Sequence, residues 1–472
     1  MRIEDHPVLS FPGGEDITFT YEGEEVSAKR GETIAAALHN AGVVELSKSG
    51  DKKRPRGLFC SIGKCSSCLM TVDGVPNVRT CITVAREGMT VEKQAGFPAL
   101  PEETEPLQPV RAETLETDVL VIGGGPAGLK GALAAAGAGA QVTVVDENPS
   151  LGGQLVKQTH KFFGSSQLEA GVRGIDIGED LVNAVNEHDN TTVMTGTSAV
   201  GIYGEAVGLY KNQERFLKIK PDKLIVAAGA TEKMIPFPNN DLPGVYGAGG
   251  IQTLMNVYGV KPGNSALMVG AGNVGLIVSY QLLQAGVDVN AVVEIAPEIG
   301  GYFVHAAKVR RFGVPILTNH SVLEVEGEER VEGVRIGEID DKGAVVENST
   351  RHLEVDLVGL AVGLSPSYKL LHHAGCELKL EGQLGGYVPV RDGRMRTTIS
   401  DIYVAGDVAG IEEATSAMLE GTVAGADAAI QLGIGGEEEE ETIADCLNKL
   451  KGLRAGPYYG ELRKSIRGVE ID

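Results

Sequence analysis

The fold is decided by the stretch TDVLVIGGGPAGLKGALAAAGAGAQVTVVDENPSLGGQ at residues 117–154. An apolar run of β-forming residues enters a glycine-rich turn, a stretch of small residues follows, and a second apolar run ends in acidic residues. Gly123 permits a tight turn, Gly125 lets the backbone approach a pyrophosphate, and Gly128 allows the helix to lie close to the strand. The stretch therefore predicts a βαβ unit that binds a dinucleotide, with the phosphates at the helix N-terminus.

Such a unit needs an acidic side chain at the end of its second strand to accept hydrogen bonds from ribose hydroxyls. Asp146 and Glu147 both stand there, and the spacing does not choose between them. The alternative is a glycine-rich turn that binds no ligand. Because strand, helix and acid are all in place, we predict cofactor contacts from the turn residues Gly123, Gly125, Pro126, Ala127 and Gly128.

A second stretch, SALMVGAGNVGLIVSYQLLQAGVDVNAVVE at residues 265–294, repeats this design. A carboxylate at Glu294 favours the free 2′-hydroxyl of NAD and repels the 2′-phosphate of NADP, and no arginine follows directly to accept that phosphate. The pattern predicts an NAD site, and the alternative is a domain that keeps the fold without binding a nucleotide. The contacts that we expect come from Gly270, Gly272, Asn273, Gly275 and Glu294.

A third element, MRTTISDIYVAGDVAG at residues 395–410, places Gly406 and Asp407 directly after a short strand. A carboxylate there can accept a hydrogen bond from a ribityl hydroxyl of a flavin that lies along the sheet. The helix expected from about Glu413 to Leu432 would bring its N-terminus near the flavin ring, where the helix dipole stabilises negative charge. Together with the first glycine turn this element predicts FAD, and we also expect contacts from Ala228 and Gly229.

Four of the six cysteines form a C-x4-C-x2-C-x12-C pattern: Cys60, Cys65, Cys68 and Cys81. The first three have the spacing of a plant-type [2Fe–2S] site. Asp73-Gly74 lies between two short apolar runs and predicts a hairpin that returns the fourth cysteine to the loop. A structural zinc site would prefer two C-x2-C pairs, and a disulfide framework belongs to small secreted domains. The remaining two cysteines, Cys376 and Cys446, are isolated and predict buried or incidental thiols.

Composition limits the classes of protein that fit. Hydrophobic residues make up 42% of the 472 residues and charged residues 22%, which suits globular domains. The net charge of −22 would repel phosphate backbones, so we expect no nucleic-acid binding. No apolar run approaches the roughly 18 residues of a membrane helix, and the start lacks the pattern of a secretory signal. We expect a cytoplasmic protein without membrane insertion.

Shifts in composition predict where domains begin and end. Prolines among acidic residues between residues 94 and 117 indicate an extended linker. Beyond it, apolar strands alternate with helical stretches, as in a parallel sheet covered on both faces. The five glutamates at 437–441 predict a second solvated linker. The predicted segments are 1–95, the linker 96–117, a first domain in two parts at 118–243 and 357–435, a second domain at 244–356, and an extension at 436–472.

Secondary structure is expected as follows. Short strands are expected within 17–27 and at 69–72, with a helix at 32–41 between them, and another helix is expected at 443–450. The sheet strands are expected at 118–121, 142–145, 224–227, 267–269, 289–293, 356–362 and 402–404. A basic stretch before the cysteine loop either steers an acidic electron carrier or is a solvated loop: Lys48, Lys52, Lys53, Arg54 and Arg56.

These motifs resemble the flavoproteins with two dinucleotide-binding domains, such as glutathione and thioredoxin reductases. The resemblance implies an α/β fold in which FAD and NAD Rossmann-like domains follow a ferredoxin-like β-grasp [2Fe–2S] domain. Those reductases carry a redox-active C-x2-C, but here the only C-x2-C lies in the cysteine loop, so disulfide reduction is not expected. The resemblance also assigns Gly153 and Gln154 to the segment that approaches the flavin.

The fusion is similar to a narrower family, the α subunits of heteromeric sarcosine oxidase, archaeal dye-linked proline dehydrogenase, opine oxidase and hydrogen cyanide synthase. Three stretches carry this similarity: GGQLVKQTHKFFGS from Gly152, VGAGNVGLIVSYQLLQAGV from Val269, and LGGYVPVRDGRMRTTISDIYVAGDVAG from Leu384. The similarity implies a hetero-oligomer whose β subunit oxidises an amine or amino acid at its own flavin. It also implies a redox carrier as partner, and in that family an FMN can lie at the subunit interface.

The sequence supports three hypotheses for function. The first is an electron-transfer subunit in which NAD(H) exchanges a hydride with FAD and FAD exchanges single electrons with the cluster. The second is a self-sufficient NADH:acceptor reductase, a diaphorase. The third is a non-catalytic scaffold whose NAD site is vestigial. The partner's substrate stays open, and a glycerol-3-phosphate-type dehydrogenase is a further candidate.

Overall fold

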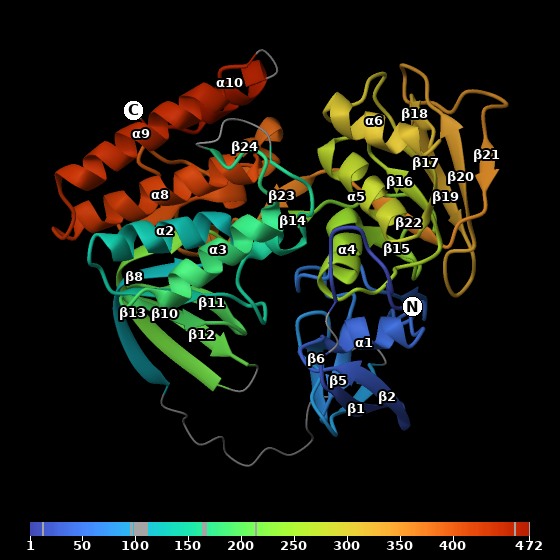
Figure 1. Cartoon of the computed structure of the whole chain (residues 1–472), viewed down its shortest axis with the longest axis horizontal. Coiled ribbons are helices and arrows are strands. Elements are labelled where there is room, and N and C mark those ends of the chain that lie inside the picture. The colour runs from blue at the N-terminus through green and yellow to red at the C-terminus, as the bar shows by residue number, and fades with distance from the viewer. Residues whose placement is uncertain are drawn as a thin grey trace. The chain divides into compact units, whose positions relative to one another are not determined.

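The structure is a computed structural model that describes residues 1–11, 14–94, 98, 112–162, 168–212, 215–456 and 459–471. The chain divides into two compact units (Figure 1). Unit 1 comprises Met1–Glu105 and Glu232–Gly363, and unit 2 comprises Pro106–Thr231 and Leu364–Asp472. Most of the expected linker at 96–117 lies outside the described residues. The strand β14 (Ala230–Glu232) ends where the chain enters the second part of unit 1.

Unit 2 is built on one large sheet with the strand order β10-β9-β8-β13-β12-β11. The end of β13 also pairs with β26, in parallel from Leu224 to Val226. Continuous apolar runs form the parallel strands, as expected for a sheet that is covered on both faces. The strands are β8 (Glu113–Ile122), β9 (Val142–Val145), β10 (Thr191–Met194), β11 (Thr197–Tyr203), β12 (Ala206–Lys211), β13 (Arg215–Val226) and β26 (Ile402–Val404).

The helices α2, α3 and α8 contact this sheet and α9 packs on α8, and Figure 1 shows α2, α8 and α9 running alongside one another. Small residues let α2 and α8 approach closely, since a Cβ at Gly421 would lie 2.0 Å from the Ala127 carbonyl oxygen. The helices are α2 (Pro126–Gly137), α3 (Gly174–Glu187), α7 (Lys369–His373), α8 (Ala414–Gln431), α9 (Glu437–Leu453) and α10 (Gly460–Gly468). Three short strands complete the unit: β23 (Leu364–Pro366), β24 (Leu378–Glu381) and β25 (Gly386–Pro389).

Unit 1 contains a second parallel sheet of strand order β15-β22-β16-β17-β18, and a separate antiparallel sheet β19-β20-β21. The helices α4 (Ala248–Gln252), α5 (Asn273–Gln284) and α6 (Phe303–Arg311) belong to this part. The strands are β15 (Val245–Gly247), β16 (Ser265–Val269), β17 (Asp288–Glu294), β18 (Ile316–Thr318), β19 (His320–Glu326), β20 (Gly333–Glu338), β21 (Arg351–Leu353) and β22 (Leu357–Leu360).

The N-terminal part of unit 1 is a mixed sheet of order β2-β1-β7-β5-β6, in which β1 and β7 are parallel. The helix α1 (Ile34–Asn40) buries an almost wholly apolar face against this sheet. The expected hairpin at Asp73-Gly74 joins β5 to β6, with both residues at positive φ. The strands are β1 (Asp16–Tyr21), β2 (Glu24–Lys29), β3 (Ser47–Lys48), β4 (Pro55–Arg56), β5 (Leu69–Val72), β6 (Val75–Arg79) and β7 (Thr90–Lys93).

The prediction of a solvated linker at 437–441 is wrong. These glutamates begin the helix α9, which also contains the helix expected at 443–450. Negative side chains in a first helical turn are stabilised by the helix dipole, and Glu439 accepts a hydrogen bond from the Gly436 N–H at 2.6 Å. A charge run therefore marks a helix start here. No described helix is both long and apolar enough to cross a bilayer.

Candidate functional site

The first glycine turn has the close contacts that its spacing predicts. Gly123 has φ +106°, and a Cβ there would lie 2.3 Å from the Ala227 carbonyl oxygen. A Cβ at Gly128 would lie 1.8 Å from the Gly123 carbonyl oxygen, so α2 starts directly against the turn. A side chain at either position would force the turn open. These residues therefore fix the backbone N–H groups at the start of α2, where phosphates bind in such folds.

Asp146 is the acid that reaches this turn. Its buried carboxylate accepts hydrogen bonds from the Gly124 N–H at 2.7 Å and from the Asn148 N–H at 2.8 Å. The Asn148 side-chain amide donates a third bond at 2.9 Å. Burial raises the pKa of Asp146, and these three bonds oppose the rise. Glu147 is half-buried beside it, and of the two acids it is Asp146 whose carboxylate these bonds hold at the turn.

The second glycine turn has the same geometry. Gly270 has φ +105°, and a Cβ there would lie 2.3 Å from the Ala361 carbonyl oxygen. The Glu294 carboxylate accepts hydrogen bonds from the Ala271 N–H at 2.8 Å and from the Ala296 N–H at 3.0 Å. Glu294 thus takes the place that Asp146 has in unit 2. The acid is held toward the turn, with its carboxylate positioned before any ligand arrives.

Each glycine turn also has a Gly-Gly segment beside it. The sequence resemblance assigns the first of these to the flavin and does not assign the second. DENPSLGGQL at 146–155 corresponds to EIAPEIGGYF at 294–303, with Pro and Gly-Gly at matching offsets from the acid. A Cβ at Gly153 would lie 2.6 Å from the Gly125 Cα, and one at Gly301 would lie 2.8 Å from the Gly272 carbonyl carbon. Each Gly-Gly segment therefore closes against its own glycine turn. Comparing the two acid-to-glycine spacings would have found this repeat.

Both turns leave open space beside their middle glycines, Gly125 and Gly272. A Cβ at Gly272 would meet no atom within 4 Å, and one at Gly125 would meet only the Gly153 Cα, at 3.7 Å. Asn273 accepts a hydrogen bond from the Tyr302 N–H at 2.7 Å, which holds the second Gly-Gly segment beside the turn. Each middle glycine thus faces an open cradle that a side chain would fill. This is the fit that a bound pyrophosphate requires.

The Gly406–Asp407 turn lies at the end of β26 in unit 2. Gly406 has φ +75° and donates its N–H to Glu420 at 3.0 Å. Burial raises the pKa of Asp407 to about 7, with smaller contributions from the carboxylates of Glu420 and Glu412, while a hydrogen bond from the Glu412 backbone opposes the rise. The helix α8 begins at Ala414, one residue from the predicted start. Gly229, at the end of the neighbouring strand segment, has φ +66° and accepts a hydrogen bond from the Ser367 N–H at 2.9 Å.

The four cysteines of the loop meet in unit 1. Cys60 contacts Cys65 and Cys81, and Cys81 contacts Cys68, through sulfur hydrogen bonds. Cys65 is half-buried and the other three are buried. These contacts link all four thiols in one group, and four cysteine thiolates are the ligand set of a [2Fe–2S] cluster.

Backbone N–H groups surround these sulfurs. The Gly63 N–H donates to the Cys81 Sγ at 3.3 Å, and backbone bonds from Ile62 and Lys64 help to lower the pKa of Cys60 after the larger effect of its contact with Cys65. Gly63, Ser61 and Ser66 all have positive φ, so the loop is bent repeatedly to aim its amides inward. Donors of this kind stabilise thiolate charge, and the residues present fit an iron–sulfur cluster.

The cysteine loop lies against the part of unit 1 that contains the second glycine turn. The Gly247 N–H donates to the Phe59 carbonyl oxygen at 3.2 Å, and a Cβ at Gly250 would lie 2.1 Å from the same oxygen. The Ser61 hydroxyl donates to the Gly250 carbonyl at 3.4 Å. The loop therefore packs directly on α4, and a side chain at Gly250 would prevent this contact.

Two of the five basic residues before the loop serve this same contact. Arg54 donates to the Asp241 carboxylate at 2.7 and 2.9 Å and to the Asn239 side chain at 3.0 Å, and Arg56 lies 3.0 Å from Asp241. Nearby, the His39 Nε2 and the Tyr246 hydroxyl are 2.6 Å apart in a buried pair. The arginines thus bind within unit 1, while the lysines 48, 52 and 53 are exposed.

Comparisons with known proteins agree with this geometry. Residues 117–421 match the pyridine nucleotide-disulphide oxidoreductase family, and residues 14–96 match the 2Fe-2S iron-sulfur cluster binding domain. The chain is 27% identical to the α subunit of sarcosine oxidase from Corynebacterium sp. strain P-1, over 92% of this chain and 45% of that protein. It is 30% identical to an opine oxidase subunit from Rhizobium meliloti strain 1021, over 65% of this chain and 69% of that protein.

Solved structures give the same fold. L-proline dehydrogenase from P. horikoshii aligns with a TM-score of 0.71 and 28% identity, over 93% of this chain and 79% of that one. Thioredoxin reductase from T. acidophilum aligns at 0.53 with 20% identity and covers 67% of this chain, which shows the fold alone.

Fold and site together define an oxidoreductase that combines FAD with a [2Fe–2S] cluster, and the predicted fold class is confirmed. The chain belongs to the pyridine nucleotide-disulphide oxidoreductase family, in the group that includes these subunits of sarcosine oxidase and opine oxidase. It spans about half the length of the sarcosine oxidase subunits that it matches. Between residues 117 and 421 its only cysteine is Cys376, so this member has no dithiol for disulfide chemistry there.

Proposed function

We propose that this chain is the electron-transfer subunit of a heteromeric amine or amino-acid dehydrogenase or oxidase, and that it uses NAD(H). Its partners would be a flavin-containing β subunit and a redox carrier, and an FMN can lie at the interface with that subunit. Relatives named as subunits of sarcosine oxidase and opine oxidase, and a neighbour named L-proline dehydrogenase, support amine and amino-acid substrates for the assembly. The predicted segments 1–95, 118–243, 244–356, 357–435 and 436–472 remain the proposed organisation.

A bound flavin would connect two-electron exchange with nicotinamide to one-electron exchange with the iron–sulfur cluster. The chain's residues bind and orient these groups. In unit 2 the first glycine turn would hold the FAD pyrophosphate, Asp146 its adenosine ribose and Asp407 a ribityl hydroxyl. The remaining proposed contacts of the flavin are Gly123, Gly125, Pro126, Ala127, Gly128, Glu147, Gly153, Gln154, Ala228, Gly229 and Gly406.

In unit 1 Glu294 would accept hydrogen bonds from the free ribose hydroxyls of NAD. A negative carboxylate already held by two backbone N–H groups would repel a 2′-phosphate, so NAD is preferred over NADP. The other proposed contacts are Gly270, Gly272, Asn273 and Gly275. Cys60, Cys65, Cys68 and Cys81 would hold the cluster.

One observation supports the use of NAD(H). The second glycine turn has both a carboxylate held toward it, Glu294, and open space at its middle glycine, Gly272. A vestigial site would be free to lose either feature. Instead Glu294 reproduces the two backbone hydrogen bonds of Asp146, and a Cβ at Gly272 would meet no atom within 4 Å.

Anaerobic titration of the purified chain with NADH tests this proposal. Bleaching of the flavin absorbance followed by reduction of the cluster supports it. No bleaching by NADH, combined with reduction by a co-purified subunit and an amine or amino acid, would show a scaffold without nicotinamide activity. Full turnover with an artificial acceptor and no co-purifying flavoprotein would instead favour the stand-alone diaphorase.

A further inference from the structure

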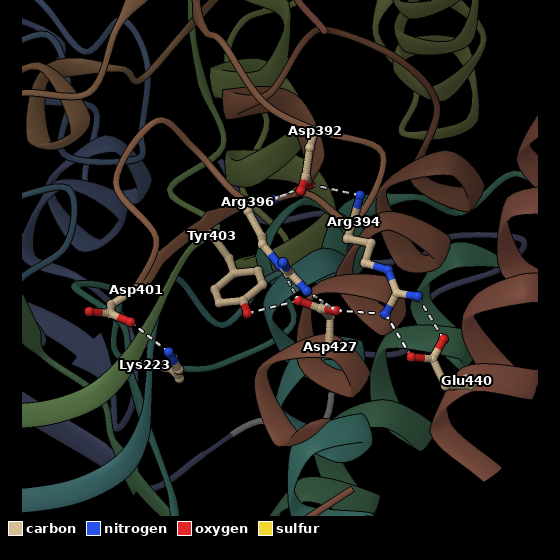
Figure 2. A network of polar contacts seen from close by, with 8 residues as sticks. All are labelled: Lys223, Asp392, Arg394, Arg396, Asp401, Tyr403, Asp427 and Glu440. Atoms are coloured by element: carbon tan, nitrogen blue, oxygen red, sulfur yellow. Dashed lines mark hydrogen bonds and ion pairs between the residues drawn. The ribbon is translucent and has the colours of Figure 1, made fainter. Parts of the chain in front are cut away.

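The C-terminal helix α9 is attached to unit 2 by ion pairs near both of its ends. Figure 2 shows the network at its start, where Arg394 reaches both Asp427 at 2.9 Å and Glu440 at 2.7 Å. Arg396 donates to the same aspartate at 2.5 and 2.6 Å, and the Tyr403 hydroxyl donates to it at 2.9 Å. Because Asp427 is on α8 and Glu440 is on α9, this network joins the two helices.

Arg454 forms the attachment at the other end, directly after the last residue of α9. Its guanidinium binds Glu412 in a bidentate pair, with donor–acceptor distances of 2.6 and 3.0 Å, and also donates to Glu420 at 2.7 Å. The arginine side chain is 15% exposed, and the two glutamates are 7% and 4% exposed. Charged hydrogen bonds that are removed from water in this way are among the strong ones.

The second oxygen of Glu420 leads to the proposed flavin turn. It accepts the Gly406 N–H at 3.0 Å, and Gly406 precedes Asp407. At Gly406 a Cβ would lie 2.9 Å from the Ala127 Cβ in the first glycine turn, so the turn has little space to move. A continuous path of hydrogen bonds therefore runs from Arg454 through Glu420 to the backbone that presents Asp407.

Arg454 offsets part of the negative charge around this path. The acidic groups that face it are Asp407 and Glu412 on the turn, Glu420 on α8, and Glu470 after α10. Burial raises the pKa of both Asp407 and Glu412. The other facing cation, Arg391, is buried and donates to the Ala409 carbonyl at 2.8 Å. Removing Arg454 would leave Glu412 and Glu420 as neighbouring buried carboxylates, which is costly.

We propose that Arg454, in the C-terminal extension, is a positioning residue of the flavin site: through its hydrogen bonds to Glu412 and Glu420 it holds the Gly406–Asp407 turn in its binding shape. This inference rests on the proposed placement of FAD at that turn. The extension would then be part of the flavin site, although no residue of it was predicted to act there.

The test compares FAD binding to the deflavinated full chain in three forms: wild type, Arg454→Gln and Arg394→Gln. The Arg394 variant is the matched control, because it removes ion pairs at the other end of α9 without touching the path to Gly406. We expect Arg454→Gln to weaken FAD binding on the order of tenfold at pH 8. The deficit should shrink towards pH 6, because a carboxyl freed from its cation can take up a proton and relieve the repulsion.

Two further variants separate positioning from misfolding. Arg454→Lys keeps the charge and should recover part of the affinity, and Glu412→Gln in the Arg454→Gln background should reduce the pH dependence. Equal FAD binding by Arg454→Gln and wild type would overturn the inference. So would a loss that is independent of pH and equalled by Arg394→Gln. A wild-type chain that binds no FAD would overturn the proposed flavin site itself, which is a separate result.

Discussion

Ionisation of Asp407 opposes folding. Its carboxyl has a pKa of about 7 because it is buried, whereas an exposed aspartate titrates near 3.8. Raising the pH from 4 to 8 therefore ionises it at an increasing cost to the folded state. We expect Asp407→Asn to raise the melting temperature of the deflavinated chain at pH 8, with the gain shrinking towards pH 4, and to weaken FAD binding. Thermal unfolding at several pH values and FAD titration measure both effects, and a gain that does not depend on pH would contradict the first.

Glu294 governs the choice of nicotinamide cofactor in our proposal. Glu294→Ala should weaken NADH binding about tenfold, since charged hydrogen bonds to ribose are lost, and should reduce the preference over NADPH. Titration calorimetry with both cofactors measures this. Glu298→Ala is the matched control, because Glu298 is an exposed acid on the same loop. Unchanged NADH affinity in Glu294→Ala would place the nucleotide elsewhere.

At this scale the sequence predicted residue types better than residue geometry. Glycines at fixed spacing identify a turn because only glycine tolerates the contacts found at Gly123 and Gly128. The choice between Asp146 and Glu147 was open because neighbouring strand residues point to opposite faces, and the register is set by the completed sheet. Asn148, which donates twice to Asp146, has no motif of its own and was missed.

The cysteine loop is the element that should lose its function most completely on a single change. Cys65→Ser replaces a thiolate ligand by a poor one, so the purified chain should lose most of its iron and acid-labile sulfide and the matching visible absorbance. Cys376→Ser is the control, because Cys376 is a buried thiol in unit 2 outside the loop. Full iron content in Cys65→Ser would contradict the proposed ligand set.

The helices α8 and α9 depend on the charge of Asp427. Burial acts to raise the pKa of Asp427, but hydrogen bonds from Arg396, Arg394 and Tyr403 outweigh it and hold the pKa below its usual value. A lowered carboxyl pKa contributes stability above the unfolded pKa near 4, and this stability is lost as the pH falls further. We expect Asp427→Asn to destabilise unit 2 on the order of 3 kcal/mol at pH 7 and progressively less below pH 4, as measured by denaturant unfolding.

The sequence predicts helices and strands well where apolar periodicity is strong. It fails where the conformation of a segment depends on the partners of its charged side chains. The strands at 142–145 and 402–404 were placed to the residue. The prediction for the glutamates at 437–441 is wrong, because such a run is either a solvated coil or the start of a helix. Which of the two forms depends on the cations and N–H donors that its carboxylates find in the folded chain. Those partners are Arg394 for Glu440 and the Gly436 N–H for Glu439.

At the scale of the whole molecule, the proline-rich segment suggested an N-terminal module separate from the rest. Residues 1–105 instead form one compact unit with 232–363. The contacts that join them are far apart in sequence, since Arg54 and Asp241 are separated by 187 residues. No local pattern reveals such a pair. The sequence therefore does not predict that the N-terminal segment packs with residues 232–363, and the predicted domain boundaries stay a prediction.

This packing gives a prediction for unit 1. Asp241→Ala removes the partner of both Arg54 and Arg56 and leaves two cations facing each other. We expect unit 1 to lose about 1–3 kcal/mol of stability, with the loss read from hydrogen exchange in α1 as well as in the strands β15 and β22. Asp222→Ala, a change of an exposed acid in unit 2, should leave those amides unaffected. Exchange that changes in α1 alone would contradict the shared unit.

The contact between the cysteine-bearing segment and the rest of unit 1 depends on two glycines. At Gly57 a methyl group would lie 2.8 Å from the Pro243 Cα, and at Gly250 one would lie 2.1 Å from the Phe59 carbonyl oxygen. At both positions the two surfaces therefore meet without a side chain on the glycine. The cysteine-bearing segment therefore cannot be grafted unchanged onto another flavoprotein. An alanine at the position of Gly250 would clash with the backbone of the grafted loop.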